Sequence, residues 1–155
     1  MSIQTLFFLL IVSAWRTAFV VHAQTCPAGQ YGTTTCTDCA AGKYSSSGDT
    51  SCTSCSIGMY AATVSSSFCT SCPAGSYCTS TGLSTCTKCV QGKYAANSGN
   101  TAVSACVTCP AGSYALTGSS SCTACSAGMY SPYTLSSSCY STPLSFVIVL
   151  TSLTT

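Results

Sequence analysis

Apolar residues gather near the two ends of the chain, at residues 6–12 and 144–150, and the region between these runs is dominated by small and polar residues. Segments such as SSSGDTS, ATVSSSF and LTGSSS contain many turn-forming residues and have no helical periodicity. This pattern predicts short, twisted hairpins with irregular loops between residues 24 and 141.

One phrase, Cys-x-x-Gly-x-Tyr, recurs seven times in this region at a period of 13 to 20 residues. Each copy is followed by a stretch rich in Ser, Thr and Gly and then by a closing Cys, two residues before the next opening Cys. A period this short indicates a linear array of units, each too small to bury a core of its own. We number the predicted units 1 to 7, at residues 26–38, 39–54, 55–71, 72–88, 89–108, 109–124 and 125–141.

The fold class that follows is small and disulfide-rich: an elongated array of seven short β-hairpin or loop units, with little helix apart from an N-terminal signal segment. The repeated glycine is expected to turn the chain at positive φ. The repeated tyrosine is the one large side chain that every unit contains, and its ring can lie across the disulfide as a substitute for a hydrophobic core. These structural positions are Gly29 and Tyr31, Gly42 and Tyr44, Gly58 and Tyr60, Gly75 and Tyr77, Gly92 and Tyr94, Gly112 and Tyr114, and Gly128 and Tyr130.

The N-terminal apolar run is followed by a small-residue cleavage pattern at residues 21–23, which predicts a secretory signal peptide over residues 1–23. A second cleavage pattern lies at residues 12–14, and an uncleaved signal anchor remains an alternative. The run is shorter than the ~20 residues that a membrane-spanning helix needs. The signal places the cysteines in an oxidising compartment, so the protein is expected to be secreted or to lie on the extracellular surface.

At the other end, residues 142–155 form a tail in which Thr142-Pro143 stands where a further unit would begin with Cys-Pro. The apolar run is too short to span a bilayer as a helix. Ser136 to Ser138 ahead of it resemble a glycolipid-anchor signal, but cleavage there would remove Cys139 and leave Cys125 without its partner. Membrane anchoring is therefore left open.

Cysteine contributes 15 of 155 residues, a level typical of disulfide scaffolds. With two cysteines per unit, the simplest connectivity is one bridge inside each unit. The competing scheme bridges each Cys-x-x-Cys and would leave the Ser-rich arms unrestrained. The first scheme gives Cys26–Cys36, Cys39–Cys52, Cys55–Cys69, Cys72–Cys86, Cys89–Cys106, Cys109–Cys122 and Cys125–Cys139.

Cys78 is left over by this scheme. It directly follows Tyr77, where other units carry Gly, Ser or Ala. An odd cysteine in a secreted chain indicates either a free thiol or an intermolecular bridge. We therefore predict that Cys78 is unpaired within the chain, with a disulfide-linked dimer through Cys78 as the alternative.

Charge and composition exclude most enzymatic functions. After residue 23 the chain has no His, Glu or Arg, and its charged residues are Asp38, Asp49, Lys43, Lys88 and Lys93. General acid–base and nucleophilic catalysis lack a base, since the single histidine, His22, belongs to the signal segment. Two isolated aspartates do not make a calcium site, and three dispersed lysines do not make a nucleic-acid-binding patch. No catalytic residue, metal site or cofactor is predicted.

Two classes of function remain. The first is a non-enzymatic rod, structural, adhesive or protein-binding, with an unidentified extracellular partner; a soluble decoy receptor shares this architecture. The second is a thiolate protein that binds zinc, because the Cys-x-x-Cys pairs approach zinc-ribbon spacing. The export signal favours oxidised cysteines and so the first class.

The repeat resembles the ephrin-receptor-like cysteine-rich repeat, through CPAGQY at Cys26, CPAGSY at Cys72 and Cys109, and the recurring Cys-x-x-Cys. It is also similar to the first, single-bridge module of tumour necrosis factor receptor ectodomains. Four of the seven units lack the proline of this pattern. The resemblance implies an elongated extracellular rod of growth-factor-receptor-like type and supports bridges within each unit. It does not imply ephrin binding or kinase activity, because those reside in domains for which this chain has no room.

Overall fold

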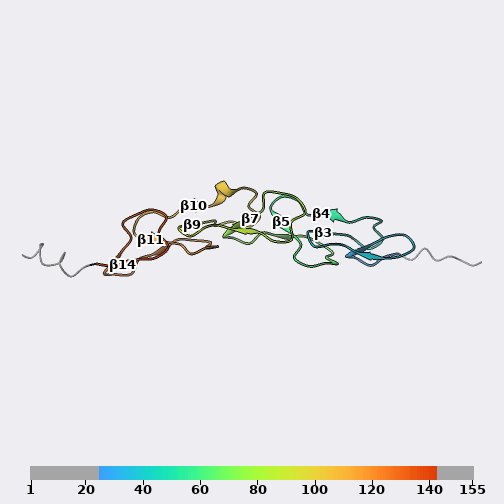
Figure 1. Ribbon diagram of the computed structural model, residues 1–155, viewed down its shortest axis with the longest axis horizontal. Coiled ribbons are helices and arrows are strands. Elements are labelled where there is room, and N and C mark those ends of the chain that lie inside the picture. Colours follow the sequence, from blue (N-terminus) through green and yellow to red (C-terminus); the bar gives the residue numbers. More distant parts are fainter. Residues whose placement is uncertain (1–24, 143–155) are drawn as a thin grey trace, which may run out of the picture.

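The computed structural model describes residues 25–142. The predicted signal peptide at residues 1–23 and residues 143–155 of the predicted tail lie outside the described residues. The described part is a narrow rod along which the seven units follow one another in sequence order, from unit 1 at one end to unit 7 at the other (Figure 1). The prediction of an elongated, disulfide-rich array of hairpins with essentially no helix is confirmed.

Each unit contributes one antiparallel hairpin of two very short strands, and the seven two-stranded sheets share no strand. In every hairpin the repeated tyrosine pairs with the residue that follows the closing cysteine, as Tyr31 does with Thr37 and Tyr77 with Thr87. The hairpins are β1 (Gln30–Tyr31) with β2 (Thr37–Asp38), β3 (Lys43–Tyr44) with β4 (Thr53–Ser54), β5 (Met59–Tyr60) with β6 (Thr70–Ser71), β7 (Ser76–Tyr77) with β8 (Thr87–Lys88), β9 (Lys93–Tyr94) with β10 (Val107–Thr108), β11 (Ser113–Tyr114) with β12 (Thr123–Ala124), and β13 (Met129–Tyr130) with β14 (Tyr140–Ser141).

A tight turn precedes the first strand of each hairpin. In unit 4 the Ser76 N–H donates to the Pro73 carbonyl at 3.1 Å, and the same bond recurs in the other six units. The repeated glycine lies at the third position of this turn, with φ between +76° and +86° in all seven copies. A turn with positive φ at its third residue is a type II turn, for which glycine is the usual occupant. The repeated spacing from Cys to Gly to Tyr therefore encodes a turn that leads into a strand.

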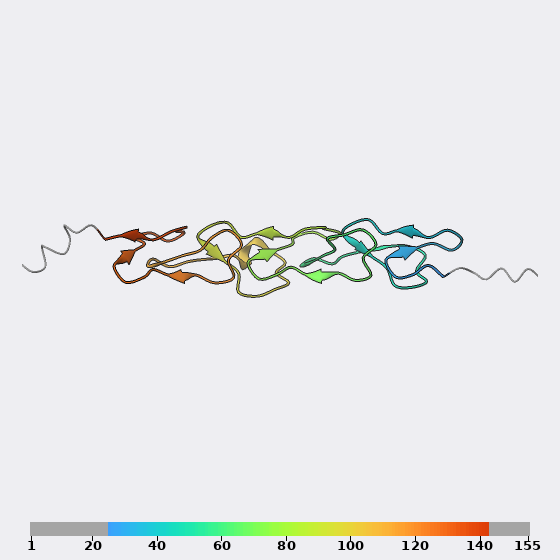
Figure 2. The ribbon, with the colours of Figure 1, turned by 90° about the horizontal axis from the view of Figure 1, so that it is seen from below.

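Consecutive units are joined by main-chain hydrogen bonds on both sides of the residue that follows each repeated tyrosine, which we call the post-Tyr position. In unit 4 this residue is Cys78. Its N–H donates to the Asn100 carbonyl of unit 5 at 3.0 Å, and its carbonyl accepts from the Gly58 N–H of unit 3 at 3.1 Å. Each unit is thus hydrogen-bonded to its neighbours. Figure 2 shows, from below, the units following one another along the rod. The other post-Tyr residues are Gly32, Ser45, Ala61, Ala95, Ala115 and Ser131.

Units also touch their second neighbours. A Cβ added at Gly75 in unit 4 would collide with the main-chain carbonyl of Gly118 in unit 6, and a Cβ at Gly42 in unit 2 would collide with Gly82 in unit 4. Units 6 and 7 have no such neighbour among the described residues, and the space beside Gly112 and Gly128 is open. Contact with first and second neighbours makes the array one continuous rod.

Disulfides and small side chains form the interior. The fully buried side chains include Cys26, Cys39, Cys55, Cys72 and Ser45. We expected each tyrosine ring to cover the disulfide of its own unit. The structure shows Tyr77 of unit 4 packed against Cys89, Ala95 and Cys106, which form the bridge region of the next unit, unit 5. The tyrosine contributes to the junction between units, because its strand leads directly into the post-Tyr residue that joins them.

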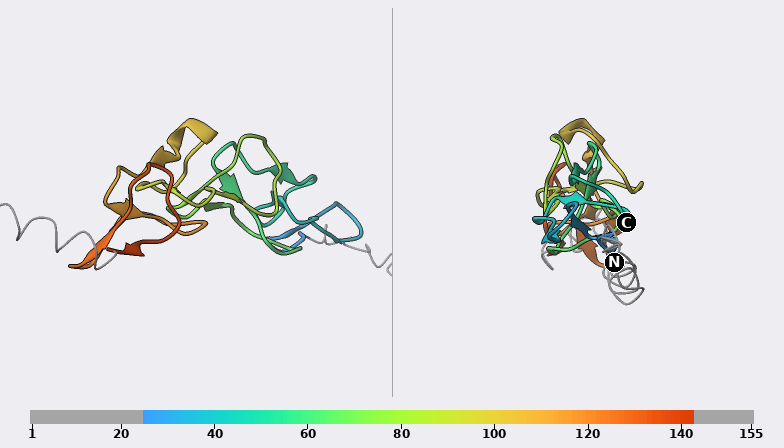
Figure 3. Two further views of the ribbon diagram at one scale, coloured as in Figure 1. Left: turned by 60° about the vertical axis from the view of Figure 1, so that its left-hand side comes forward. Right: turned by 90° about the vertical axis from the view of Figure 1, so that its right-hand side faces the viewer.

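Two departures from the hairpin pattern remain. Unit 5 has the longest loop, and there a 3-10 helix, η1 (Val103–Ala105), stands at the outer edge of the rod without a buried residue (Figure 3). After unit 7, Thr142 takes the place of an eighth opening cysteine, since its N–H donates to the Gly128 carbonyl at 3.1 Å as Cys125 does to Gly112. Within residues 25–142, no helix has the length and apolar character needed to cross a membrane.

Candidate functional site

The structure places a disulfide at each of the seven pairs that the spacing suggested. They are Cys26–Cys36, Cys39–Cys52, Cys55–Cys69, Cys72–Cys86, Cys89–Cys106, Cys109–Cys122 and Cys125–Cys139. The Cα atoms of these pairs lie 5.4 to 5.8 Å apart, within the range that an unstrained bridge needs. The two cysteines of each Cys-x-x-Cys belong to different bridges, so each motif links two successive units.

The exception to this regular ladder is Cys78. Its Sγ lies within bonding reach of Cys72 Sγ, which also bonds Cys86. The three sulfurs lie within 4.8 Å of one another and form a three-sulfur cluster. A sulfur atom in a disulfide bonds one partner, so Cys72 is shared by two competing partners.

This arrangement corrects the expectation that Cys78 stands outside the repeat, because its sulfur lies beside the bridge of its own unit and competes with Cys86 for Cys72. The post-Tyr position faces the opening cysteine of its own unit, as Gly32 shows in unit 1: a Cβ added there would lie 3.6 Å from Cys26 Sγ. Other units place Ser or Ala at this buried position. A cysteine there brings a third sulfur to the bridge, and Cys78 is fully buried. An intermolecular bridge formed directly by Cys78 would require unit 4 to open; the dimer itself stays a prediction.

Among the described residues, the three-sulfur cluster is the place where three side chains of metal-binding type come together. Zinc is held by thiolates, whereas the cysteines of this ladder are oxidised in pairs. The two cysteines of each Cys-x-x-Cys are bonded to different partners and do not converge on a common point. The disulfide ladder therefore fits the first functional class rather than the zinc-ribbon alternative.

A cavity of about 280 Å³ opens beside the three-sulfur cluster. Cys86 and Thr85 line it from unit 4 and Tyr60 lines it from unit 3, while Gly118 contributes from unit 6. Lys88 is the one charged side chain in its wall. Cys86 is half-buried, in contrast to the fully buried Cys72 and Cys78. Within the three-sulfur cluster, Cys86 is thus the cysteine that lines an accessible cavity, and Lys88 lines the same cavity.

The Asp38 carboxylate joins unit 1 to unit 3 through hydrogen bonds. The Ser65 hydroxyl and the Gln30 amide, which donates to Asp38 Oδ1 at 2.8 Å, lower the pKa of Asp38 because they stabilise its ionised form. The side chain is solvent-exposed. Asp38 therefore serves as a hydrogen-bond acceptor between units.

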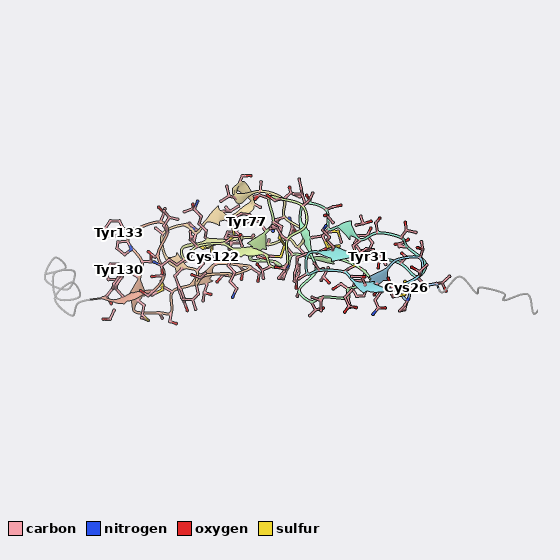
Figure 4. The ribbon with its side chains drawn as sticks, turned by 45° about the vertical axis from the view of Figure 1, so that its right-hand side comes forward. Cys26, Tyr31, Tyr77, Cys122, Tyr130 and Tyr133 are labelled. Carbon is pink, nitrogen blue, oxygen red and sulfur yellow. A yellow bond between two sulfur atoms is a disulfide. The ribbon has the colours of Figure 1, made fainter. Side chains whose placement is uncertain are left out.

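Unit 7 carries an exposed aromatic patch, which we define as Tyr130, Tyr133 and Tyr140. These side chains are 39%, 75% and 55% exposed. Tyr130 and Tyr140 face each other across the last hairpin, with ring centroids 6.2 Å apart. Tyr130 and Tyr133 lie at the far end of the rod from Cys26 and Tyr31 (Figure 4). The tyrosines of the repeated motif in units 1 to 6 are half-buried.

Sequence reasoning missed three features of this surface. The cavity beside Cys86 depends on residues from units 3, 4 and 6, which no single repeat contains. The post-Tyr position joins neighbouring units, but in the sequence it showed only as a small residue at the equivalent position of each of the seven units. Tyr133 and Tyr140 lie outside the repeated motif. The sequence feature that could have indicated them is that unit 7 has tyrosines where the other units have smaller or polar residues.

Comparison with known families supports the repeat assignment. Residues 42–84 match the family described as "Tyrosine-protein kinase ephrin type A/B receptor-like". The match runs from the turn glycine of unit 2 into the loop of unit 4. No curated protein matches the chain. The matched repeat is a non-catalytic module, and such disulfide-rich modules are typical of extracellular and cell-surface proteins. The chain thus contains an ephrin-receptor-like cysteine-rich module.

Proposed function

We propose that this protein is a non-enzymatic, secreted or cell-surface rod that binds an extracellular protein partner, with the aromatic patch of unit 7 as its main contact. The observation that carries the proposal is the exposure of Tyr130, Tyr133 and Tyr140 at one end of the rod. Aromatic side chains are enriched at protein interfaces and provide much of the binding energy there.

The physical character of the rod agrees with this role. Its units are interlocked through first and second neighbours, so it can present a contact surface at a fixed distance from its other end. Residues 25–142 carry three lysines and two aspartates, so the surface is nearly uncharged. Binding would depend on apolar and hydroxyl contacts and would therefore change little with salt. A decoy-receptor role would differ only in having one specific ligand.

Secretion and the disulfide ladder are tested first. The full chain expressed in a eukaryotic host should appear in the medium or on the cell surface. Its mass should rise on reduction by two hydrogens for each of seven bridges. Intracellular retention with reduced cysteines and bound zinc would overturn the proposal in favour of the thiolate class.

The contact surface is tested by binding of the labelled protein to the surface of cells of the source tissue or culture. The double variant Tyr133→Ser/Tyr140→Ser should bind about tenfold or more weakly, because an aromatic anchor is worth about 1–2 kcal/mol or more at an interface. The matched control is Val64→Ser/Phe68→Ser, which removes two side chains of unit 3 that are 61% and 68% exposed. Equal losses in both variants, or no binding by the unaltered protein, would contradict the proposal.

A further inference from the structure

Unit 4 contains a chemical group that the proposed binding function does not use. Its bridge, Cys72–Cys86, has a third cysteine beside it at the post-Tyr position, where the equivalent residues of units 3, 5 and 6 are Ala61, Ala95 and Ala115. The bridge atoms and Cys78 Sγ lie within 4.8 Å of one another. A thiolate next to a disulfide is the arrangement from which thiol–disulfide exchange proceeds.

We propose that unit 4 is an internal thiol–disulfide exchange site, in which Cys78 displaces Cys86 from Cys72 and makes Cys86 the accessible thiol. The Cys78 thiolate forms a bond to Cys72 Sγ, the Cys72–Cys86 bond breaks, and its electron pair leaves on Cys86 Sγ. The proton lost by Cys78 is balanced by protonation of Cys86. One disulfide is replaced by another, so the step consumes neither an oxidant nor a reductant.

The main chain holds Cys78 in position for this step. Its N–H donates to Asn100 of unit 5 and its carbonyl accepts from Gly58 of unit 3, so the residue is fixed from both sides. Its Sγ lies 3.6 Å from the carbonyl oxygen of Thr85, the residue that precedes Cys86 in the sequence. The Cα atoms of Cys72 and Cys78 are 6.8 Å apart, at the upper end of the range that a disulfide spans, and those of Cys72 and Cys86 are 5.8 Å apart. Cys72 can therefore bond either partner.

The two states of the exchange differ in what solvent can reach. With Cys72 bonded to Cys86, the remaining thiol is the fully buried Cys78. With Cys72 bonded to Cys78, the remaining thiol is Cys86, which is half-buried and lines the cavity of about 280 Å³ together with Lys88. A cationic neighbour favours the thiolate, which is the reactive form. The exchange thus converts a protected thiol into one that can react with an external disulfide or a thiol-directed reagent.

This site changes the expected location of an intermolecular bridge. A mixed disulfide with an external disulfide, or with a second copy of the chain, would form at Cys86 in the cavity rather than at the buried Cys78. The inference rests on the three-sulfur cluster alone and does not depend on a protein partner for the rod.

Alkylation of the native protein tests the exchange. The secreted full chain is treated with N-ethylmaleimide, quenched, digested without reduction and mapped by mass spectrometry. We expect the label on Cys86, in molecules that contain a Cys72–Cys78 bridge. Label on Cys78 with the Cys72–Cys86 bridge intact would overturn the proposal. So would a native protein that resists labelling and yields only labelled Cys78 after denaturation.

Two variants separate the exchange from simple opening of unit 4. Cys78→Ala restores the residue found at the same position in units 3, 5 and 6, and it should abolish native labelling. Label on Cys86 in this variant would show that the bridge opens without Cys78 and would contradict the mechanism. Cys86→Ser should retain seven bridges, one of them Cys72–Cys78, with no thiol available to the reagent. Labelling of both Cys72 and Cys78 in that variant would likewise overturn the proposal.

Discussion

At the scale of single residues, the repeated glycine has two separate functions. The first is local, since the turn before each hairpin needs positive φ at that position. The second depends on the array, because in units 1 to 5 the space where a side chain would begin is filled by the main chain of the unit two places along. In units 6 and 7 only the local function remains. Equivalent glycines should therefore differ in their tolerance of substitution.

Comparison of Gly75→Ala with Gly128→Ala measures this difference. Both glycines have φ near +80°, so both variants lose about 1–2 kcal/mol from the left-handed conformation. Gly75→Ala also drives a Cβ into the Gly118 carbonyl, whereas the space beside Gly128 is open among the described residues. We expect Gly75→Ala to lower the free energy of unfolding by about 1–3 kcal/mol more than Gly128→Ala does. Denaturant unfolding with the disulfides intact, followed by tyrosine fluorescence, gives both values; equal losses would contradict stacking of second neighbours.

At the scale of elements, each hairpin has only two residues per strand and would not be stable alone. The disulfide closes each unit, and the neighbouring unit supplies further hydrogen bonds. Unit 5 shows this most clearly, because Asn100 pairs with Tyr77 of unit 4 as an isolated parallel bridge. The Asn100 side-chain amide also donates to the Ser76 carbonyl at 3.0 Å and to the Asn97 carbonyl at 2.6 Å. One side chain thus fixes a loop and joins two hairpins.

Replacement of Asn100 by alanine should lower the free energy of unfolding by about 1–2 kcal/mol, because the half-enclosed Ser76 carbonyl loses a donor. Asn97→Ala is the matched control, since the exposed Asn97 takes part through its main-chain carbonyl. The control should change stability by less than about 0.5 kcal/mol, as surface substitutions usually do. Denaturant titration of both variants provides the measurement. A control that loses as much as Asn100→Ala would show that the amide does not join the hairpins.

At the scale of the whole molecule, the rod behaves as a one-dimensional array in which each unit depends on those that follow it. The Gly112 N–H donates to the Ser131 carbonyl and the Ala115 N–H donates to the Ser136 carbonyl, so unit 7 supplies acceptors for unit 6. Equivalent bonds join units 2 and 3, where Gly42 donates to Ala61. Removal of a unit at one end should therefore destabilise the adjacent units and leave the stability of the far end unchanged.

A chain that ends at Ala124 tests this dependence. Removal of unit 7 deletes the acceptors of the Gly112 and Ala115 amides, and these amides should exchange hydrogen for deuterium faster in the truncated chain. The Gly42 amide of unit 2, five units away, should exchange at the same rate in both chains. Hydrogen–deuterium exchange with mass spectrometry measures all three. Faster exchange along the whole rod would instead indicate that the array unfolds as a single cooperative body.

The sequence by itself determined the hairpin array and its repeat, and it suggested a bridge within each unit as the simplest connectivity. These features follow from local spacing: a glycine sets the turn, a tyrosine begins the strand, and two cysteines per unit close the loop. The resemblance to ephrin-receptor-like repeats was also visible in the residues, and the match at residues 42–84 confirms it.

Only the tertiary structure decided the surroundings of Cys78, the packing of Tyr77 on the next bridge and the cavity beside Cys86. Each of these depends on how units stack on their first and second neighbours. That stacking is set by main-chain hydrogen bonds and by the space that a missing Cβ leaves. Such interactions cannot be read from residue types, because any small residue at the post-Tyr position is compatible with them. A cysteine at this position was therefore visible in the sequence as an exception, and the stack placed its sulfur beside a bridge.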